Sequence, residues 1–212
     1  MGIIKDGILG GFQGSVGPVT GSNWRGINVM RGKPSGKRKK SSEGQLRQMA
    51  KLSLMSGFLR PVTGLLNMTY NNVAIPMTCF NKALSYNMRN AVMGDYPTFA
   101  VNYEQVVLGS GDLLNVKKVT AGSTSKGTIT FSWADNSGEG SARATDQAFV
   151  AVYCVILDQW KTSDEGPQRN AGSYTLDVTV FSGKEVQTYI GFVSSDSKFV
   201  STSLYTGLVN IL

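Results

Sequence analysis

The side chains that could do acid–base or metal chemistry in this chain gather in one short stretch. Asp158, Asp164 and Glu165 lie near Trp160 in the sequence DQWKTSDEGP. Paired carboxylates act in glycoside hydrolysis, and clustered carboxylates bind calcium. Calcium loops, however, alternate their oxygen ligands at a tighter and more regular spacing. We therefore favour a solvated acidic loop over a catalytic or calcium-binding site.

The residues that other catalytic sites require are missing from the sequence. The chain has no histidine, which excludes Ser-His-Asp and Cys-His catalysis, HExxH zinc sites and histidine-ligated haem. Cys79 and Cys154 are 75 positions apart and match no metal-ligand spacing, so we favour buried free thiols over one disulfide. Glycines recur every three or four residues from Gly7 to Gly21, but without the flanking strand, helix and Gly-Lys-Ser/Thr of a phosphate-binding loop. We expect no enzymatic activity and no cofactor.

Positive charge concentrates near the N-terminus. Residues 1–60 carry eleven basic and two acidic residues, a net charge of +9, whereas residues 61–212 have a net charge of −2. A basic region of this kind fits an anionic partner, such as nucleic acid, an acidic protein surface or anionic lipid, and equally fits a solvated tether. The candidate anion or nucleic-acid contacts are Arg31, Lys33, Lys37, Arg38, Lys39 and Lys40.

The elements that position these residues begin with a glycine-rich arm and basic linker, residues 1–41. Ten glycines within residues 1–36 disfavour a helix, because each costs about 1 kcal/mol relative to alanine. We expect two strands, Ser15–Thr20 and Trp24–Arg31, joined by Gly21–Asn23. A two-stranded hairpin is marginal alone in water, so this arm should dock on the body of the protein or on a neighbouring subunit. The candidate assembly residues of the arm are Trp24, Ile27 and Val29.

Residues 42–98 predict a helical segment. Ser42 lies three residues before Gln45, a capping-box spacing that marks a helix start, and Pro61 should kink or end that helix. A second helix is expected over Thr78–Met93, and the methionines of the segment are expected to fill a core. The expected apolar face of the first helix comprises Leu46, Met49, Ala50, Leu54, Phe58 and Leu59.

From Phe99 onward the apolar period is two, which is typical of strands. About seven short strands, with Trp133 as an inward tryptophan, predict an immunoglobulin-like or fibronectin-like β-sandwich over residues 99–212, with a barrel as the alternative. The whole chain is therefore expected to be mainly β with two helices. The expected strands are Tyr103–Leu108, Val116–Ala121, Thr128–Trp133, Phe149–Leu157, Ser173–Phe181, Gln187–Val193 and Leu204–Leu212. The expected sandwich core is Phe131, Trp133, Val152, Val155, Leu176, Val178, Ile190 and Phe192.

Three segments in order carry a resemblance to known sequences. They are MGIIKDGILGGFQGSVGPVTGSNWRG, SEGQLRQMAKLSLMSGFLRPVTGLLN and MTCFNKALSYNMRNAVMGDYP. With them the chain resembles a family of uncharacterised proteins from Bacteroidota and their phages. The resemblance implies that a glycine-rich arm, a helical middle and a β-sandwich form one unit. It implies no activity and no site residues.

The sequence also bears on location and role. No apolar run approaches the roughly 20 residues of a membrane helix, and the N-terminus does not resemble a secretory signal. We expect synthesis in the cytoplasm, with a virion or an extracellular assembly as further locations.

Three roles suit this organisation. The first is a structural, self-assembling subunit of a virion, tail or filament that contacts copies of itself through the arm. The second is a non-specific nucleic-acid-binding protein that uses the basic arm. The third is an adhesion or carbohydrate-binding sandwich that uses an exposed Trp160 or Tyr153.

Overall fold

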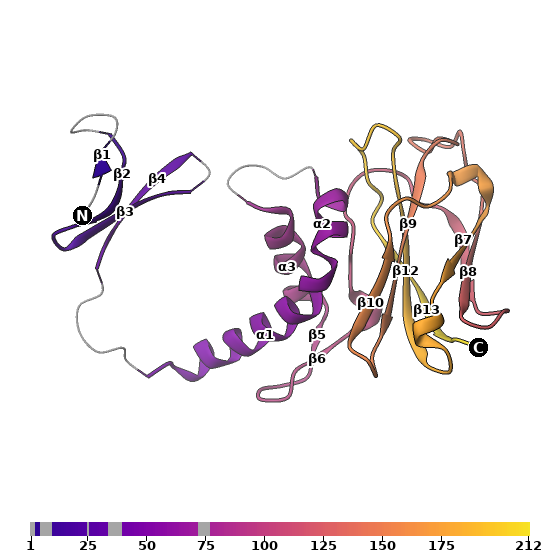
Figure 1. Ribbon diagram of the computed structural model, residues 1–212, viewed down its shortest axis with the longest axis horizontal. Coiled ribbons are helices and arrows are strands. Elements are labelled where there is room, and N and C mark those ends of the chain that lie inside the picture. The colour runs from indigo at the N-terminus through magenta and orange to yellow at the C-terminus, as the bar shows by residue number, and fades with distance from the viewer. Residues whose placement is uncertain (1–2, 5–9, 25, 34–39, 72–76) are drawn as a thin grey trace. The chain divides into compact units, whose positions relative to one another are not determined.

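The structure, a computed structural model, divides into two compact units, residues 1–42 and residues 43–212 (Figure 1). The first unit holds a four-stranded sheet, and the second holds three α-helices together with a β-sandwich. The structure describes residues 3–4, 10–24, 26–33, 40–71 and 77–212.

The N-terminal sheet is an antiparallel meander in the order β1-β2-β3-β4. The expected two-stranded hairpin is therefore wrong, since Gly21–Asn23 lies inside a strand rather than in a turn. The turns instead use Gly17, at φ +54°, and Gly26, at φ +85°, backbone conformations that favour glycine. Gly21 is needed for packing, because a Cβ there would lie 2.7 Å from the Phe12 ring. The strands are β1 Ile3–Ile4, β2 Phe12–Val16, β3 Val19–Trp24 and β4 Ile27–Gly32.

The helices follow the expected plan with one shortened end. The first helix ends at Leu59, just before Pro61, as expected. Pro61 lies in a 3₁₀ turn, Arg60–Val62, and a second helix begins directly after it. The Thr78 hydroxyl caps the third helix by accepting from the Asn81 backbone N–H at 3.1 Å. That helix ends three residues earlier than expected. The helices are α1 Glu43–Leu59, α2 Thr63–Thr69 and α3 Cys79–Asn90.

None of the helices in the described ranges is long and apolar enough to span a membrane. A short two-stranded ribbon follows α3, formed by β5 Val92–Met93 and β6 Ala100–Val101.

Two antiparallel sheets form the expected immunoglobulin/fibronectin-like β-sandwich. The central sheet has the strand order β10-β9-β12-β13, and the outer sheet has the order β11-β8-β7. The outer-sheet strands are β7 Lys117–Gly122, β8 Thr128–Ala134 and β11 Ser173–Asp177. The central-sheet strands are β9 Gln147–Cys154, β10 Gln159–Ser163, β12 Glu185–Val193 and β13 Leu204–Asn210.

The central sheet is buried on both faces. Along β9, Phe149, Ala151 and Tyr153 join a hydrophobic cluster with the helices, whereas Val150 and Val152 join a second cluster with the outer sheet. Helices, central sheet and outer sheet therefore stack as three layers in the second unit (Figure 1). This burial explains why β9 and β12 are apolar almost throughout rather than alternating.

The strand expected at Tyr103–Leu108 is wrong. Its first residues form a 3₁₀ turn, and side chains satisfy the backbone that follows. The buried Asn87 amide donates to the Val107 carbonyl at 2.8 Å, and its oxygen accepts from the Val107 N–H at 2.9 Å. Leu108 donates to the Ser203 hydroxyl at 2.8 Å. The segment is extended but pairs with side chains instead of a neighbouring strand.

Several expected burials are also wrong. Val155 lies exposed in the turn between β9 and β10, although the other seven expected sandwich-core residues are buried. In the first half of α1, Leu46 and Met49 are exposed, so only the C-terminal half of that helix enters a core. Of the other methionines expected to fill a core, Met77 and Met93 are exposed while Met55 is fully buried.

Candidate assembly interface

The three candidate assembly residues lie on one face of the N-terminal sheet. Trp24 pairs directly with Ile27 across the turn, so their side chains share a face. Val29 follows Ile27 by two positions and therefore points to the same side. All three side chains are exposed, at 43–46%. Together they form the apolar part of the Trp24 face, a surface that also carries Ser22 and Thr20 and has no covering layer among the described residues of this unit.

The opposite face is also apolar, and this was not foreseen. Met30 and Val16 alternate with the Trp24-face residues along their strands and are 68% and 50% exposed. Phe12 packs on Gly21 on the same side and is only half-buried. The Gly17-Pro18 dipeptide, a strong turn signal, could have revealed this face, because it sets the register that aligns Val16 with Val19.

Strand β4 adds an open edge to these two faces. It is the last strand in the sheet order, and all six of its residues are exposed. An edge strand presents unpaired backbone N–H and C=O groups, which makes it a template for pairing with another strand. The unit thus offers apolar faces and backbone hydrogen-bonding groups for contact with other surfaces.

The candidate anion contacts divide into described and undescribed residues. Arg31 lies in β4 two positions from Val29, so it belongs to the Trp24 face. Lys33 follows β4 and donates its backbone N–H to the Pro18 carbonyl at 2.7 Å, and Lys40 is exposed. Lys37, Arg38 and Lys39 lie outside the described residues.

Two residues of the acidic stretch, Asp158 and Trp160, form structural contacts. Trp160 lies in β10, which replaces half of the expected loop, and its indole N–H donates to the Phe58 carbonyl at 3.0 Å. Asp158 accepts from the Tyr153 hydroxyl at 2.7 Å. Within the described ranges, no three His, Cys, Asp or Glu side chains gather as a metal site would require.

The aromatic side chains beside this stretch, Tyr153 and Trp160, pack in the hydrophobic cluster shared with the helices. Burial, and then the hydrogen bond to Asp158, raises the pKa of Tyr153 above its ordinary value. Tyr153 is 5% exposed and Trp160 is half-buried, so neither ring offers the exposed surface that an adhesion role for them requires. Both cysteines are free, with Cys154 buried and Cys79 half-buried.

Comparison with protein families supplies a match along almost the whole chain. Residues 11–207 match the model of a family of unknown function, DUF6266. The chain belongs to this family. The match spans β2 to β4 of the N-terminal sheet as well as the helices and the sandwich, so membership in DUF6266 covers both units. No curated protein matches the chain.

Solved structures similar to the chain cover about half of it. The chicken CNTN1 FN1–FN3 domains are 17% identical over 48% of this chain and 34% of their own, with a TM-score of 0.39. The fn3 domain of human collagen alpha-1(XX) is 12% identical over 49% of this chain and 91% of its own, with a TM-score of 0.36. The chain thus spans about a third of the CNTN1 structure. The sandwich assignment rests on the strand order of the two sheets.

Proposed function

We propose that this DUF6266 member is a structural, self-assembling protein whose N-terminal sheet contacts a neighbouring copy. The surrounding structure would be a virion, tail or filament, in keeping with the resemblance to proteins of Bacteroidota and their phages. The observation that carries the proposal is a sheet with exposed apolar side chains on both faces and an open edge at β4. Such a sheet is incomplete until another layer covers it.

The size of the first unit supports oligomerisation as the means of covering the sheet. Domains of about 40 residues or fewer usually need disulfides, metals or oligomerisation to remain folded. Residues 1–42 contain neither cysteine nor histidine and only one acidic residue, Asp6. A disulfide or a metal is therefore excluded as an internal staple, and the sheet needs cover from the second unit or from a neighbouring copy.

A second copy is the occupant that this surface suits best. Two Trp24 faces can stack as the two sheets of a sandwich do, each covering the apolar side chains of the other. Contacts between identical surfaces are self-complementary and close into symmetric assemblies. The open β4 edge can add strand pairing to the same contact or link the next copy in a series.

Replacement of the Trp24 face tests the proposal. The variant carries Trp24→Ser, Ile27→Ser and Val29→Ser, and the matched control carries Val155→Ser, Ile156→Ser and Val180→Ser, three exposed apolar residues of the second unit. Sedimentation velocity over a range of concentrations should show assemblies for the native chain and the control, and monomers for the variant. Equal assembly of variant and native chain would refute a role for this face.

Non-specific nucleic-acid binding is a second candidate, because Arg31 shares a face with Trp24. An arginine beside an exposed aromatic ring suits a single strand, whose bases stack while its phosphates are neutralised. The test is fluorescence anisotropy with a mixed-sequence single-stranded oligonucleotide at several salt concentrations.

Serine at Lys37, Arg38 and Lys39 should flatten the salt dependence by about 2 in slope, on the basis of roughly 0.7 per charge. Serine at Lys118, Lys126 and Lys161, exposed lysines of the second unit, is the matched control. An unchanged slope in the first variant would leave the basic run as a solvated tether.

A further inference from the structure

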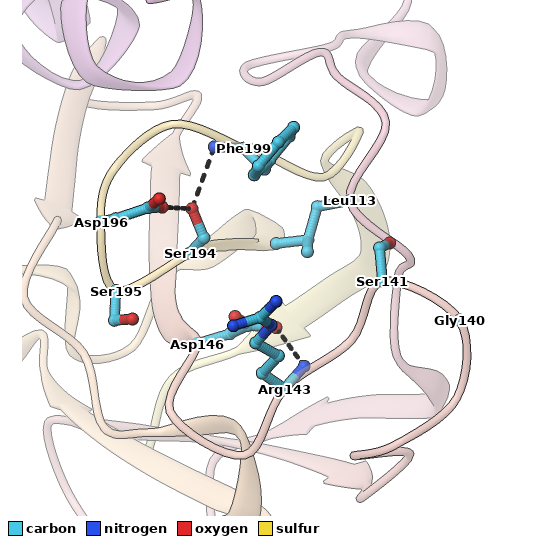
Figure 2. Close-up of a pocket in the computed structure, with 9 residues that line it drawn as sticks. All are labelled: Leu113, Gly140, Ser141, Arg143, Asp146, Ser194, Ser195, Asp196 and Phe199. Atoms are coloured by element: carbon cyan, nitrogen blue, oxygen red, sulfur yellow. Dashed lines mark hydrogen bonds between the residues drawn. The ribbon is translucent and has the colours of Figure 1, made fainter.

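A cavity opens at one end of the β-sandwich, and the described residues that line it all belong to the second unit. It has a volume of about 370 Å³, within the range of small-molecule sites. Three connections meet there: the segment before β7, the β8–β9 loop and the β12–β13 loop. Figure 2 shows Arg143 and Asp146 on one side of the hollow, facing Asp196 and Phe199 on the other.

A buried arginine fixes the floor of this cavity. Arg169 is fully buried and donates from Nε to the Asp146 Oδ2 atom at 3.1 Å. Its two terminal nitrogens donate to Asn136 Oδ1 at 2.8 Å and to the Leu114 carbonyl at 2.9 Å. These bonds join the β8–β9 loop to the segment before β7. The loops therefore hold their places before any ligand binds, which lowers the entropic cost of binding.

One oxygen of the floor is left without a partner. The Asp146 carboxylate is 1% exposed, and its Oδ2 atom accepts from the Arg143 backbone N–H at 2.8 Å and from Arg169. Its Oδ1 atom has no hydrogen-bond partner among the described residues. An unsatisfied buried acceptor is costly, so the floor favours a ligand or water molecule that donates a hydrogen bond to it.

The rim of the cavity adds donors, acceptors and an aromatic surface. The Arg143 guanidinium has no ion-pair partner in the described part of the chain. The Ser194 hydroxyl donates to Asp196 at 2.6 Å and accepts from the Phe199 N–H at 2.9 Å, which holds the β12–β13 loop in place. The hydrogen bond from Ser194 lowers the pKa of Asp196 below its ordinary value. The Phe199 side chain is 57% exposed.

These groups select among ligand classes. Asp146 pairs with Arg169 at 3.1 Å and Asp196 pairs with Lys198 at 3.6 Å, so neither carboxylate adds an uncompensated charge to the lining. The charged and polar lining disfavours a purely apolar ligand. A sugar ring offers hydroxyls that both donate and accept, together with a C–H face that packs on an aromatic ring. We propose that this cavity is a binding site for a saccharide, with Phe199 stacking on the ring and Arg143, Asp146 and Asp196 binding its hydroxyls.

Saturation-transfer NMR on the full chain tests the proposal. The probes are the methyl glycosides of glucose, galactose, mannose and N-acetylglucosamine, each titrated alone. We expect saturable binding of at least one glycoside. Phe199→Ala and Arg143→Ala should each weaken that binding about fivefold or more, since aromatic and charged contacts at binding sites are worth about 1 kcal/mol or more. The matched controls, Val180→Ala and Lys126→Ala, remove exposed side chains at the opposite end of the sandwich and should leave binding unchanged.

The same experiment can overturn the proposal in two ways. No saturable binding of any of the four glycosides would refute a saccharide site in this cavity. Binding that both pocket variants leave unchanged would place the sugar elsewhere on the molecule. Circular dichroism of Phe199→Ala and Arg143→Ala should match that of the native chain, because both side chains are on exposed loops.

Discussion

The molecule contains two four-stranded antiparallel sheets with opposite surroundings. The central sheet has helices on one face and the outer sheet on the other, so nearly every residue of β9 and β12 is buried. The N-terminal sheet has the same number of strands, yet β4 is exposed along its whole length. Both sheets have apolar side chains on both faces. Among the described residues of each unit, only the central sheet has covering layers.

The difference between the two sheets shows that the formation of strands and the stability of a sheet have different causes. Alternating apolar residues and glycine turns are sufficient to define the strands of the N-terminal sheet, but burial supplies most of the stabilising free energy of a sheet. In the central sheet that free energy comes from the chain itself. For the N-terminal sheet we expect it to come from a neighbouring copy, and the comparison can be tested by substitutions on each side of it.

The largest effect is expected at Phe149, whose ring is 1% exposed on the helix-facing side of β9. Glycines leave room for it, because a Cβ at Gly191 would lie 2.3 Å from the ring. Phe149→Ala should lower the free energy of unfolding by about 3–5 kcal/mol, measured by chemical denaturation. Met30→Ala, in the N-terminal sheet, should change the unfolding of the second unit by less than about 0.5 kcal/mol. Equal effects would erase the contrast between the two sheets.

A smaller loss of stability is expected on substitution of Asn87. Its side chain makes the hydrogen bonds to the Val107 backbone that a neighbouring strand would otherwise make. Asn87→Leu fills a similar volume but removes the acceptor of the Val107 N–H at 2.9 Å and one of the two donors to its C=O at 2.8 Å, which leaves the carbonyl only the Tyr70 hydroxyl at 3.1 Å. Loss of these bonds in a buried setting should cost about 1–3 kcal/mol of unfolding free energy. The control is Asn90→Leu, an exposed asparagine of the same helix, which should cost much less. A neutral Asn87→Leu would show that Val107 finds other partners.

Backbone segments that pair with distant side chains cannot be predicted from the sequence pattern alone. Period-two patterns predict six of the seven sandwich strands in outline, because each of these strands packs at least one face against a core. Tyr103–Leu108 has the same pattern, but its hydrogen-bond partners come from Asn87 and Ser203, far away in sequence. The edge strand β10 was missed because its sequence, QWKTS, is mostly polar.

The surfaces of the N-terminal sheet and the cavity of the second unit also differ in how far the sequence predicts them. The alternation of Ile27 and Val29 is local, so their shared face could be predicted, whereas the apolar opposite face depended on the turn at Gly17. The cavity in the second unit gives no local signal. Its floor depends on Arg169 and Asp146, which are 23 positions apart in the sequence and meet only in the folded chain.

The smallest effect concerns the tyrosines, all of which lie in the second unit. Burial raises the pKa of Tyr70, Tyr153 and Tyr189 above the ordinary value of 10.0. Because the folded state favours the protonated phenols, their contribution to stability is complete below about pH 10 and is lost as the pH rises further. Ultraviolet absorbance should show these phenols ionising only as the second unit unfolds. Full ionisation near pH 10 with the unit still folded would contradict this burial.

Removal of the N-terminal unit tests the central claim most directly. Residues 1–41 are deleted, and sedimentation velocity is combined with a thermal melt for the deleted and native chains. The account predicts that the native chain assembles and that the deleted chain is a folded monomer, because both hydrophobic clusters lie within residues 43–212. A native chain that stays monomeric at high concentration would contradict the account, as would a deleted chain that assembles normally or unfolds.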